Sequence, residues 1–115
     1  TMQLTDAVRA EIPPGTLYML ILRTLARRGP LHGYAIAKDI QQLSDEVLRV
    51  EEGSLYPALE RMLLKGWVRA EWARTESNRR ARYYTLTAAG RRQLASEVTE
   101  FTRVMDAIVR VIQPA

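Results

Sequence analysis

The 115-residue sequence contains no cysteine, a single histidine and a single phenylalanine. The missing cysteines exclude disulfides, zinc–thiolate sites and cysteine nucleophiles, and they are typical of a cytoplasmic protein. With one histidine, the sequence supports neither a Ser/His/Asp catalytic triad nor a metal centre with several histidine ligands. It also has no glycine-rich phosphate-binding loop. We therefore expect no enzyme activity, no metal and no cofactor.

Long apolar runs are also absent, and no stretch reaches the length that would span a membrane. The first twelve residues carry Asp6, Arg9 and Glu11, which argues against a secretory signal peptide. We therefore expect a cytoplasmic protein without a membrane partner. Hydrophobic residues make up 47% of the sequence and charged residues 26%, as in an ordinary globular protein of one domain.

The net charge of +4 is unevenly distributed. Residues 61–92 carry nine basic and two acidic side chains, whereas the rest of the chain carries eight basic and eleven acidic ones. Fifteen of the seventeen basic residues are arginine, whose planar guanidinium suits phosphates and guanine edges. This focused basic segment favours a nucleic-acid binder. The alternative is a solvated surface that happens to be unevenly charged.

Apolar residues at helical spacing predict helices over residues 3–12, 16–28, 32–43, 53–65 and 88–113. Residues 13–15 (Pro-Pro-Gly), Gly29 and Gly66 end three of them, and Thr87 is suited to cap the last. Pro57 is expected in the first turn of its helix, where a missing N–H costs little.

The apolar period changes from 3.6 to 2 after the fourth helix. This alternation predicts strands over residues 67–73 and 82–87, joined by a polar tip at 75–80. A separate short extended piece is predicted before the fourth helix, at residues 47–50. The order of elements indicates a mainly α winged helix-turn-helix fold with a small β-hairpin wing. We expect residues 1–87 to form the DNA-binding domain and residues 88–115 a C-terminal dimerisation helix, within a single compact unit.

Three motifs stand in this order along the chain. They are HGYAI at 32–36, GSLYPAL at 53–59 with RML to GWV at 61–68, and RYYTLTAAG at 82–90. Together they resemble the PadR family of bacterial transcriptional regulators, in its short form with one C-terminal helix, over residues 14–110. The resemblance implies a homodimeric winged-helix repressor that a small molecule often releases from DNA.

The helix over residues 53–65 is the expected recognition helix. Its outer face is predicted to gather Ser54, Tyr56, Pro57 and Arg61. Ser54 and Tyr56 can donate hydrogen bonds to phosphate, and Arg61 can hold phosphate or a guanine edge. The alternatives are that Ser54 only caps the helix and that Tyr56 packs on the core.

Two further groups are predicted to contact DNA. Around the hairpin tip stand Arg79, Arg80 and Arg82, which suit the minor groove unless they are only solubilising charges. Tyr34 and Lys38 lie near the start of the helix over 32–43, and a helix start favours phosphate. His32 is expected to cap this helix or to pack locally.

The last helix carries an a/d heptad pattern with spacings of 4, 3, 4, 3 and 4. Its members are Leu94, Val98, Phe101, Met105, Ile108 and Ile112. Such a seam favours pairing with a second copy of the chain, and residues 3–12 are expected to assist this pairing. The alternative is an ordinary helix that packs on the chain's own core.

These features predict a homodimer that binds double-stranded DNA at a pseudo-palindromic operator. A small-molecule effector is expected in the dimer cleft between the last helix and the winged domain. Two alternatives stay open: a winged-helix module that binds another protein instead of DNA, and a constitutive DNA binder without a ligand.

Overall fold

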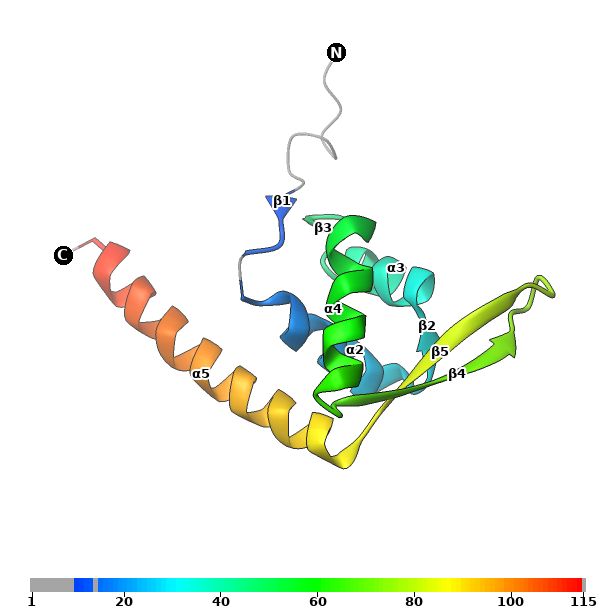
Figure 1. Ribbon diagram of the computed structural model, residues 1–115. Coiled ribbons are helices and arrows are strands. Elements are labelled where there is room, and N and C mark those ends of the chain that lie inside the picture. Colours follow the sequence, from blue (N-terminus) through cyan, green and yellow to red (C-terminus); the bar gives the residue numbers. More distant parts are fainter. Residues whose placement is uncertain (1–9, 14, 115) are drawn as a thin grey trace, which may run out of the picture.

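The computed structural model describes residues 10–13 and 15–114 (Figure 1). Its elements are β1 (Ala10–Glu11), α2 (Leu17–Arg28), β2 (Leu31–His32), α3 (Gly33–Leu43), β3 (Leu48–Arg49), α4 (Glu52–Leu64), β4 (Val68–Arg74), β5 (Arg80–Leu86) and α5 (Ala88–Ile112). A mainly helical body carries a β-hairpin wing and a long C-terminal helix, which confirms the predicted fold class. The helices predicted from residue 16 onward and both wing strands lie within two residues of their expected bounds.

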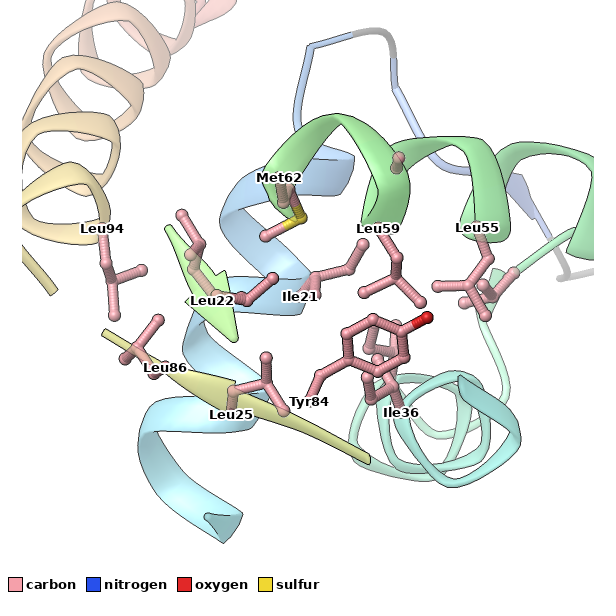
Figure 2. Close-up of a cluster of buried hydrophobic side chains, with 14 residues drawn as sticks. Ile21, Leu22, Leu25, Ile36, Leu55, Leu59, Met62, Tyr84, Leu86 and Leu94 are labelled. Carbon is pink, nitrogen blue, oxygen red and sulfur yellow. The ribbon is translucent and has the colours of Figure 1, made fainter. Parts of the chain in front are cut away.

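Helix α2 forms the centre of the core because it is apolar on most sides. Its residues Ile21, Leu22 and Leu25 are buried, and the helix packs against α3, α4, α5 and β5. Around it gather Ile36 of α3, Leu55, Leu59 and Met62 of α4, Tyr84 and Leu86 of β5, and Leu94 of α5 (Figure 2). This shared core holds the helix-turn-helix, the base of the wing and the start of α5 together.

The wing is an antiparallel sheet in the order β2-β5-β4. Strands β4 and β5 pair over their full length, from Val68 opposite Leu86 to Arg74 opposite Arg80. The two-residue strand β2 pairs with β5 on its other edge, so the wing is joined to the start of α3. The far end of the hairpin projects beyond the helical body (Figure 1).

The predicted helix over residues 3–12 is wrong at its C-terminal end. Ala10 and Glu11 form β1, which pairs in parallel with β3. Pro13 disfavours the helical region for the residue before it, and pairing with β3 holds the extended backbone. Residues 3–9 lie outside the described residues, and so does most of the segment expected to assist dimerisation.

Helix α4 begins earlier than predicted. Glu51 occupies the N-cap position and Glu52 lies in the first turn, where negative charge is favourable. Pro57 therefore lies in the second turn, and its predicted place in the first turn is wrong. Since proline has no N–H, the carbonyl of Gly53 lacks its usual helical donor, yet α4 continues through this position to Leu64.

The start of α5 is fixed to the body by two small residues. Thr87 caps the helix as predicted, because its Oγ1 accepts a hydrogen bond from the N–H of Gly90 at 3.0 Å. A β-carbon on Gly90 would overlap the carbonyl oxygen of Trp67, so only glycine allows this close approach. The 25-residue helix is about 38 Å long at 1.5 Å per residue, and it diverges from the wing (Figure 1). Among the described residues, no helix is long and apolar enough to cross a membrane.

Candidate nucleic-acid interface

Helix α4 buries one stripe and exposes the rest of its surface. The buried residues are Leu55, Ala58, Leu59 and Met62. Ser54, Tyr56, Pro57 and Arg61 are all exposed, but they do not form one cluster. At 100° per residue, Tyr56 and Arg61 are ~140° apart around the helix axis, and Ser54 and Pro57 lie on the Arg61 side. The predicted grouping of all four on one face is therefore wrong.

Arg61 lies on the flank of α4 that faces α2. Its Nε donates a hydrogen bond to the hydroxyl of Tyr18, and its guanidinium lies 5.6 Å from the centre of the Tyr18 ring. Tyr18 packs edge-on against Trp67, which packs on the core. The remaining guanidinium N–H groups have no partner among the described residues. Arg61 is thus a restrained cation that keeps free donors.

Tyr56 lies on the opposite flank, over the start of α3. A β-carbon on Gly33 would come within 2.6 Å of Cε1 of Tyr56, so a side chain at position 33 would require the Tyr56 ring to move. Tyr56 still remains 43% exposed. With Tyr34 and Lys38 it lines a hollow of about 280 Å³ between α3 and α4. Tyr56 therefore combines local packing with an exposed surface.

Ser54 does not cap α4, because Glu51 holds the N-cap position. The capping alternative for Ser54 is therefore wrong. Its side chain is exposed, and no described residue forms a hydrogen bond with its hydroxyl. Ser54 also lines a second hollow of about 300 Å³, together with Pro13 and Arg49. The hydroxyl is free to bond an external acceptor.

The start of α3 presents a phenol and a cation. His32 caps the helix as predicted, since its Nδ1 accepts a hydrogen bond from the N–H of Ala35 at 3.2 Å. The His32 ring stacks on Tyr34 and meets the edge of Tyr83 of β5. Lys38 Nζ lies 6.0 Å from the centre of the Tyr34 ring. These contacts place Tyr34 and Lys38 beside the N-terminus of α3.

A buried carboxylate fixes α3 against α2. Asp39, whose side chain is 8% exposed, accepts hydrogen bonds from Arg27 at 2.6 Å and from Arg28 at 2.9 Å. A buried charge requires such partners. The sequence placed both arginines only at the C-terminal end of α2, so this connection was not predicted. Within residues 10–13 and 15–114, no three His, Cys, Asp or Glu side chains gather to hold a metal ion.

The wing carries arginines on one face. Because side chains alternate along a strand, Trp72 and Arg74 of β4 point to the same side as their cross-strand partners Arg82 and Arg80 of β5. At the base of the wing, this is the side that turns toward the core. The Arg80 guanidinium lies 5.1 Å from the centre of the Trp72 ring, and Trp72 is 59% exposed. The result is a basic and aromatic surface.

The tip of the wing is held by contacts among its own residues. Asn78 adopts a φ of 64°, and Arg74 donates to its carbonyl oxygen at 3.1 Å. The side chain of Arg79 is exposed and has no ionic partner in the described part of the chain. Sequence reasoning missed Arg74 and Trp72 as members of this surface. Strand alternation combined with the pairing register is the signal that finds them.

Arg82 faces α4 and not the tip. Its Nη1 forms an ion pair with Oε1 of Glu60 at 2.8 Å, and its guanidinium lies 5.9 Å from the centre of the Tyr84 ring. Burial raises the pKa of the Tyr84 phenol, against the opposing effect of the Arg82 charge. The ion pair joins the arginine face of the wing to the exposed face of α4 as one continuous surface.

Most of α5 exposes its apolar seam. Val98, Phe101, Met105, Ile108 and Ile112 are between 38% and 72% exposed. Leu94, in contrast, is buried in the core of its own chain (Figure 2). The predicted seam is corrected accordingly: Leu94 anchors α5, and the exposed row begins at Val98.

The sequence matches the family model described as "Transcriptional regulator PadR-like family" over residues 21–96. An uncharacterised 37.1 kDa protein in transposon TN4556 of Streptomyces fradiae is 44% identical over 86 residues. That match covers 75% of this chain but 23% of the relative, so the chain spans less than a quarter of its length. Uncharacterised protein X of Lysinibacillus sphaericus is 27% identical over 101 residues, which cover 88% of this chain and 92% of that protein.

Solved structures share the fold. A transcriptional regulator from Clostridium thermocellum superimposes with a TM-score of 0.78 at 26% identity, over 86% of this chain and 95% of that one. A PadR family transcriptional regulator from Eggerthella lenta gives 0.71 at 31% identity, over 88% and 85%. Bacillus subtilis PadR, solved in complex with operator DNA, gives 0.64 at 24% identity, over 75% and 48%. Because the family model covers more than half of the sequence and takes in the helix-turn-helix and the wing, the chain belongs to the PadR-like family of transcriptional regulators.

Proposed function

We propose that this protein is a homodimeric, sequence-specific DNA-binding repressor that a small-molecule effector releases from its operator. The observation that carries the proposal is the arginine face of the wing, which the Arg82–Glu60 ion pair joins to the exposed face of α4. The similar fold of Bacillus subtilis PadR, solved with operator DNA, supports double-stranded DNA as the partner.

In this proposal α4 enters the major groove, as the second helix of a helix-turn-helix does. Tyr56 and Arg61 lie on opposite flanks of α4, so they suit phosphates on the two strands that border the groove. Ser54 offers its free hydroxyl on the Arg61 side, and Pro57 lies nearest the groove floor. Hydrogen bonds to phosphate orient the protein on the duplex and carry no sequence information themselves.

The wing and α3 extend this contact along the backbone. Arg79 and Arg80 suit the minor groove next to the recognition helix, where the negative potential attracts arginine. Arg82 supports them from the base of the wing. Tyr34 and Lys38 suit phosphates at the start of α3, because a helix N-terminus favours anions.

Residues 88–115 serve as the dimerisation element in this proposal. From Val98 onward, the apolar row on α5 has no core of its own chain to cover it, and symmetric pairing with a second α5 buries the row on both copies. Such pairing presents two α4 helices to successive major grooves, about 34 Å apart, on a pseudo-palindromic operator.

Repression and its release complete the proposal. A dimer seated on an operator blocks other proteins from the same DNA, and action on chromosomal DNA places the protein in the cytoplasm. We place the effector in the dimer cleft between α5 and the winged domain. There a ligand acts by favouring a dimer geometry with a different spacing of the recognition helices.

The test is selection of binding sites from random duplex DNA, followed by affinity measurements over a range of salt concentrations. We expect an inverted repeat with half-sites about one helical turn apart, and affinity that falls steeply with salt. Salt-sensitive binding without an enriched sequence would indicate a non-specific binder. No binding to any duplex would favour the protein-interaction alternative.

The effector is tested separately, on the DNA-free protein and on its complex with the selected operator. A ligand that binds the free protein should raise its melting temperature by mass action and should displace the operator at the same concentrations. A broad screen of small molecules that produces neither effect would support constitutive DNA binding.

A further inference from the structure

The outermost stripe of α4 contains a single hydrogen-bonding side chain. At 100° per residue, the positions opposite the buried stripe are Gly53, Pro57, Glu60 and Leu64. Glycine, proline and leucine side chains neither donate nor accept hydrogen bonds, and an ionised glutamate only accepts. The side chain of Glu60 is 60% exposed, and Leu64 is 88% exposed. This stripe can therefore accept hydrogen bonds from a ligand but cannot donate them.

The donors of α4 lie elsewhere. Ser54 and Arg61 occupy one flank and Tyr56 the other, and Arg61 is additionally bonded to Tyr18. A recognition helix turns its outer stripe to the floor of the major groove, where the base edges lie, and its flanks to the phosphates at the walls. The base edge that meets Glu60 must consequently supply the donor.

Two base edges in the major groove supply a donor: the N4 amino group of cytosine and the N6 amino group of adenine. In adenine the amino group stands beside N7, an acceptor that repels a carboxylate. In cytosine the neighbouring major-groove atom is the C5–H carbon, which causes no such repulsion. A carboxylate in this position therefore selects cytosine.

Arg82 offsets the charge problem that a carboxylate meets near phosphates. Its Nη1 contacts Oε1 of Glu60 at 2.8 Å, whereas Oε2 of Glu60 has no hydrogen-bond partner among the described residues. One carboxylate oxygen is thus held and neutralised from the wing, and the other remains available to a base. The contact also orients the side chain before DNA arrives, which lowers the entropy cost of binding.

We propose that Glu60 is a specificity-determining residue that accepts a hydrogen bond from the N4 amino group of a cytosine in each operator half-site, with Arg82 holding its other oxygen. The inference rests on the proposed DNA-binding function. It goes beyond that proposal by assigning one base position to one carboxylate. Arg61 is left to phosphate, and not to the guanine edge that the sequence also allowed.

The experiment compares base preferences at every operator position, by binding-site selection, for the wild type and for Glu60→Ala and Glu60→Gln. At one position per half-site the wild type should prefer cytosine over thymine roughly 5- to 150-fold, the range for a good base contact. Glu60→Ala should reduce this preference to below about 2-fold and leave the other positions unchanged. Glu60→Gln should shift the preference to adenine, whose N6 and N7 match an amide.

Two control variants separate base reading from effects of charge and wing position. Glu71→Gln also removes one negative charge, but from the opposite face of the wing, and it should leave every base preference unchanged. Arg82→Gln removes the ion pair with Glu60 by changing the arginine instead of the carboxylate. This variant should weaken binding to all sequences, while cytosine stays the preferred base. Melting temperatures close to that of the wild type should accompany all four variants, since each changed side chain is at least partly exposed.

Three results overturn the inference, and they are distinguishable. If the wild type selects an operator but Glu60→Ala keeps its full set of base preferences, Glu60 only tethers the wing and the proposed function stands. If the altered position prefers a base other than cytosine in the wild type, the assignment of the donor is wrong. If the wild type binds no duplex at all, the proposed DNA-binding function is refuted, and the role of Glu60 in base recognition is refuted with it.

Discussion

Replacing Met105 with aspartate tests the dimer directly. Met105 lies in the middle of the exposed row on α5 and is 38% exposed in the single chain. Full burial of such a side chain contributes ~1.5–3 kcal/mol. Since only the exposed 38% of Met105 is left to bury, each copy gains about 0.6–1.1 kcal/mol. A twofold dimer loses this contribution twice, about 1.1–2.3 kcal/mol in total.

That loss corresponds to a rise of roughly 7- to 40-fold in the dimer dissociation constant, at 1.4 kcal/mol per factor of ten. Two carboxylates that face each other across the axis raise it further, because both must lose water near a like charge. The measurement is sedimentation equilibrium over a dilution series, and affinity for the selected operator is measured on the same samples. The variant should be monomeric where the wild type is dimeric, and its operator affinity should fall accordingly.

Ser96→Asp is the matched control. It introduces the same charge on the same helix, but ~160° around the axis from the centre of the apolar row, at an exposed position. It should remain dimeric. A Met105→Asp protein that dimerises as tightly as the wild type would refute the reasoning, since the interface would then exclude the middle of α5.

Three further outcomes follow from particular contacts. The double variant Arg79→Ala/Arg80→Ala should lower the slope of log affinity against log salt by up to ~1.8, and an unchanged slope would remove the wing tip from the DNA contact. Gly90→Ala should lower the free energy of unfolding by about 3 kcal/mol or more in urea titrations, because its β-carbon meets a backbone carbonyl; Gly53→Ala, at an open site, should cost nothing. Burial raises the pKa of Tyr84 above its ordinary value of 10.0, so stability is full below that pH and falls as the pH rises through the folded-state pKa. Urea midpoints between about pH 9 and pH 12 should show this fall, and Tyr84→Phe should reduce it.

The elements that the sequence predicts well are those with local signals. Helix α2 is apolar on most sides and ends at Gly29, whose φ is 83°, so its spacing and its end are both readable. The wing strands are seven residues long each, which is enough for an alternation of apolar and polar residues to be recognised. By contrast, β1 and β2 are two residues long, and their partners lie far along the chain. No periodicity exists over two residues, so pairing decides their conformation.

The candidate site shows the same division between local and distant causes. The residue types could be predicted from composition and motifs, and the His32 cap depends only on its neighbours. The flank on which Arg61 is held depends on Tyr18, 43 residues earlier. The direction of Arg82 depends on Glu60, 22 residues earlier. Such contacts between distant side chains leave no pattern in the sequence, although helical angles alone separate Tyr56 from Arg61.

The core links the surface assigned to dimerisation with the surface assigned to DNA. Leu94 fixes the start of α5 in the same core as α2, and α4 packs on α2. At the other end of α2, Arg27 and Arg28 hold Asp39 of α3. The winged domain and the first turns of α5 must therefore move as one body. In a dimer paired along the exposed row, the spacing of the two α4 helices is then set where the α5 helices cross. Since a rotation at that crossing is magnified over the length of α5, the proposed effector in the proposed dimer cleft would shift the recognition helices from the ~34 Å spacing of successive major grooves without touching any residue assigned to DNA.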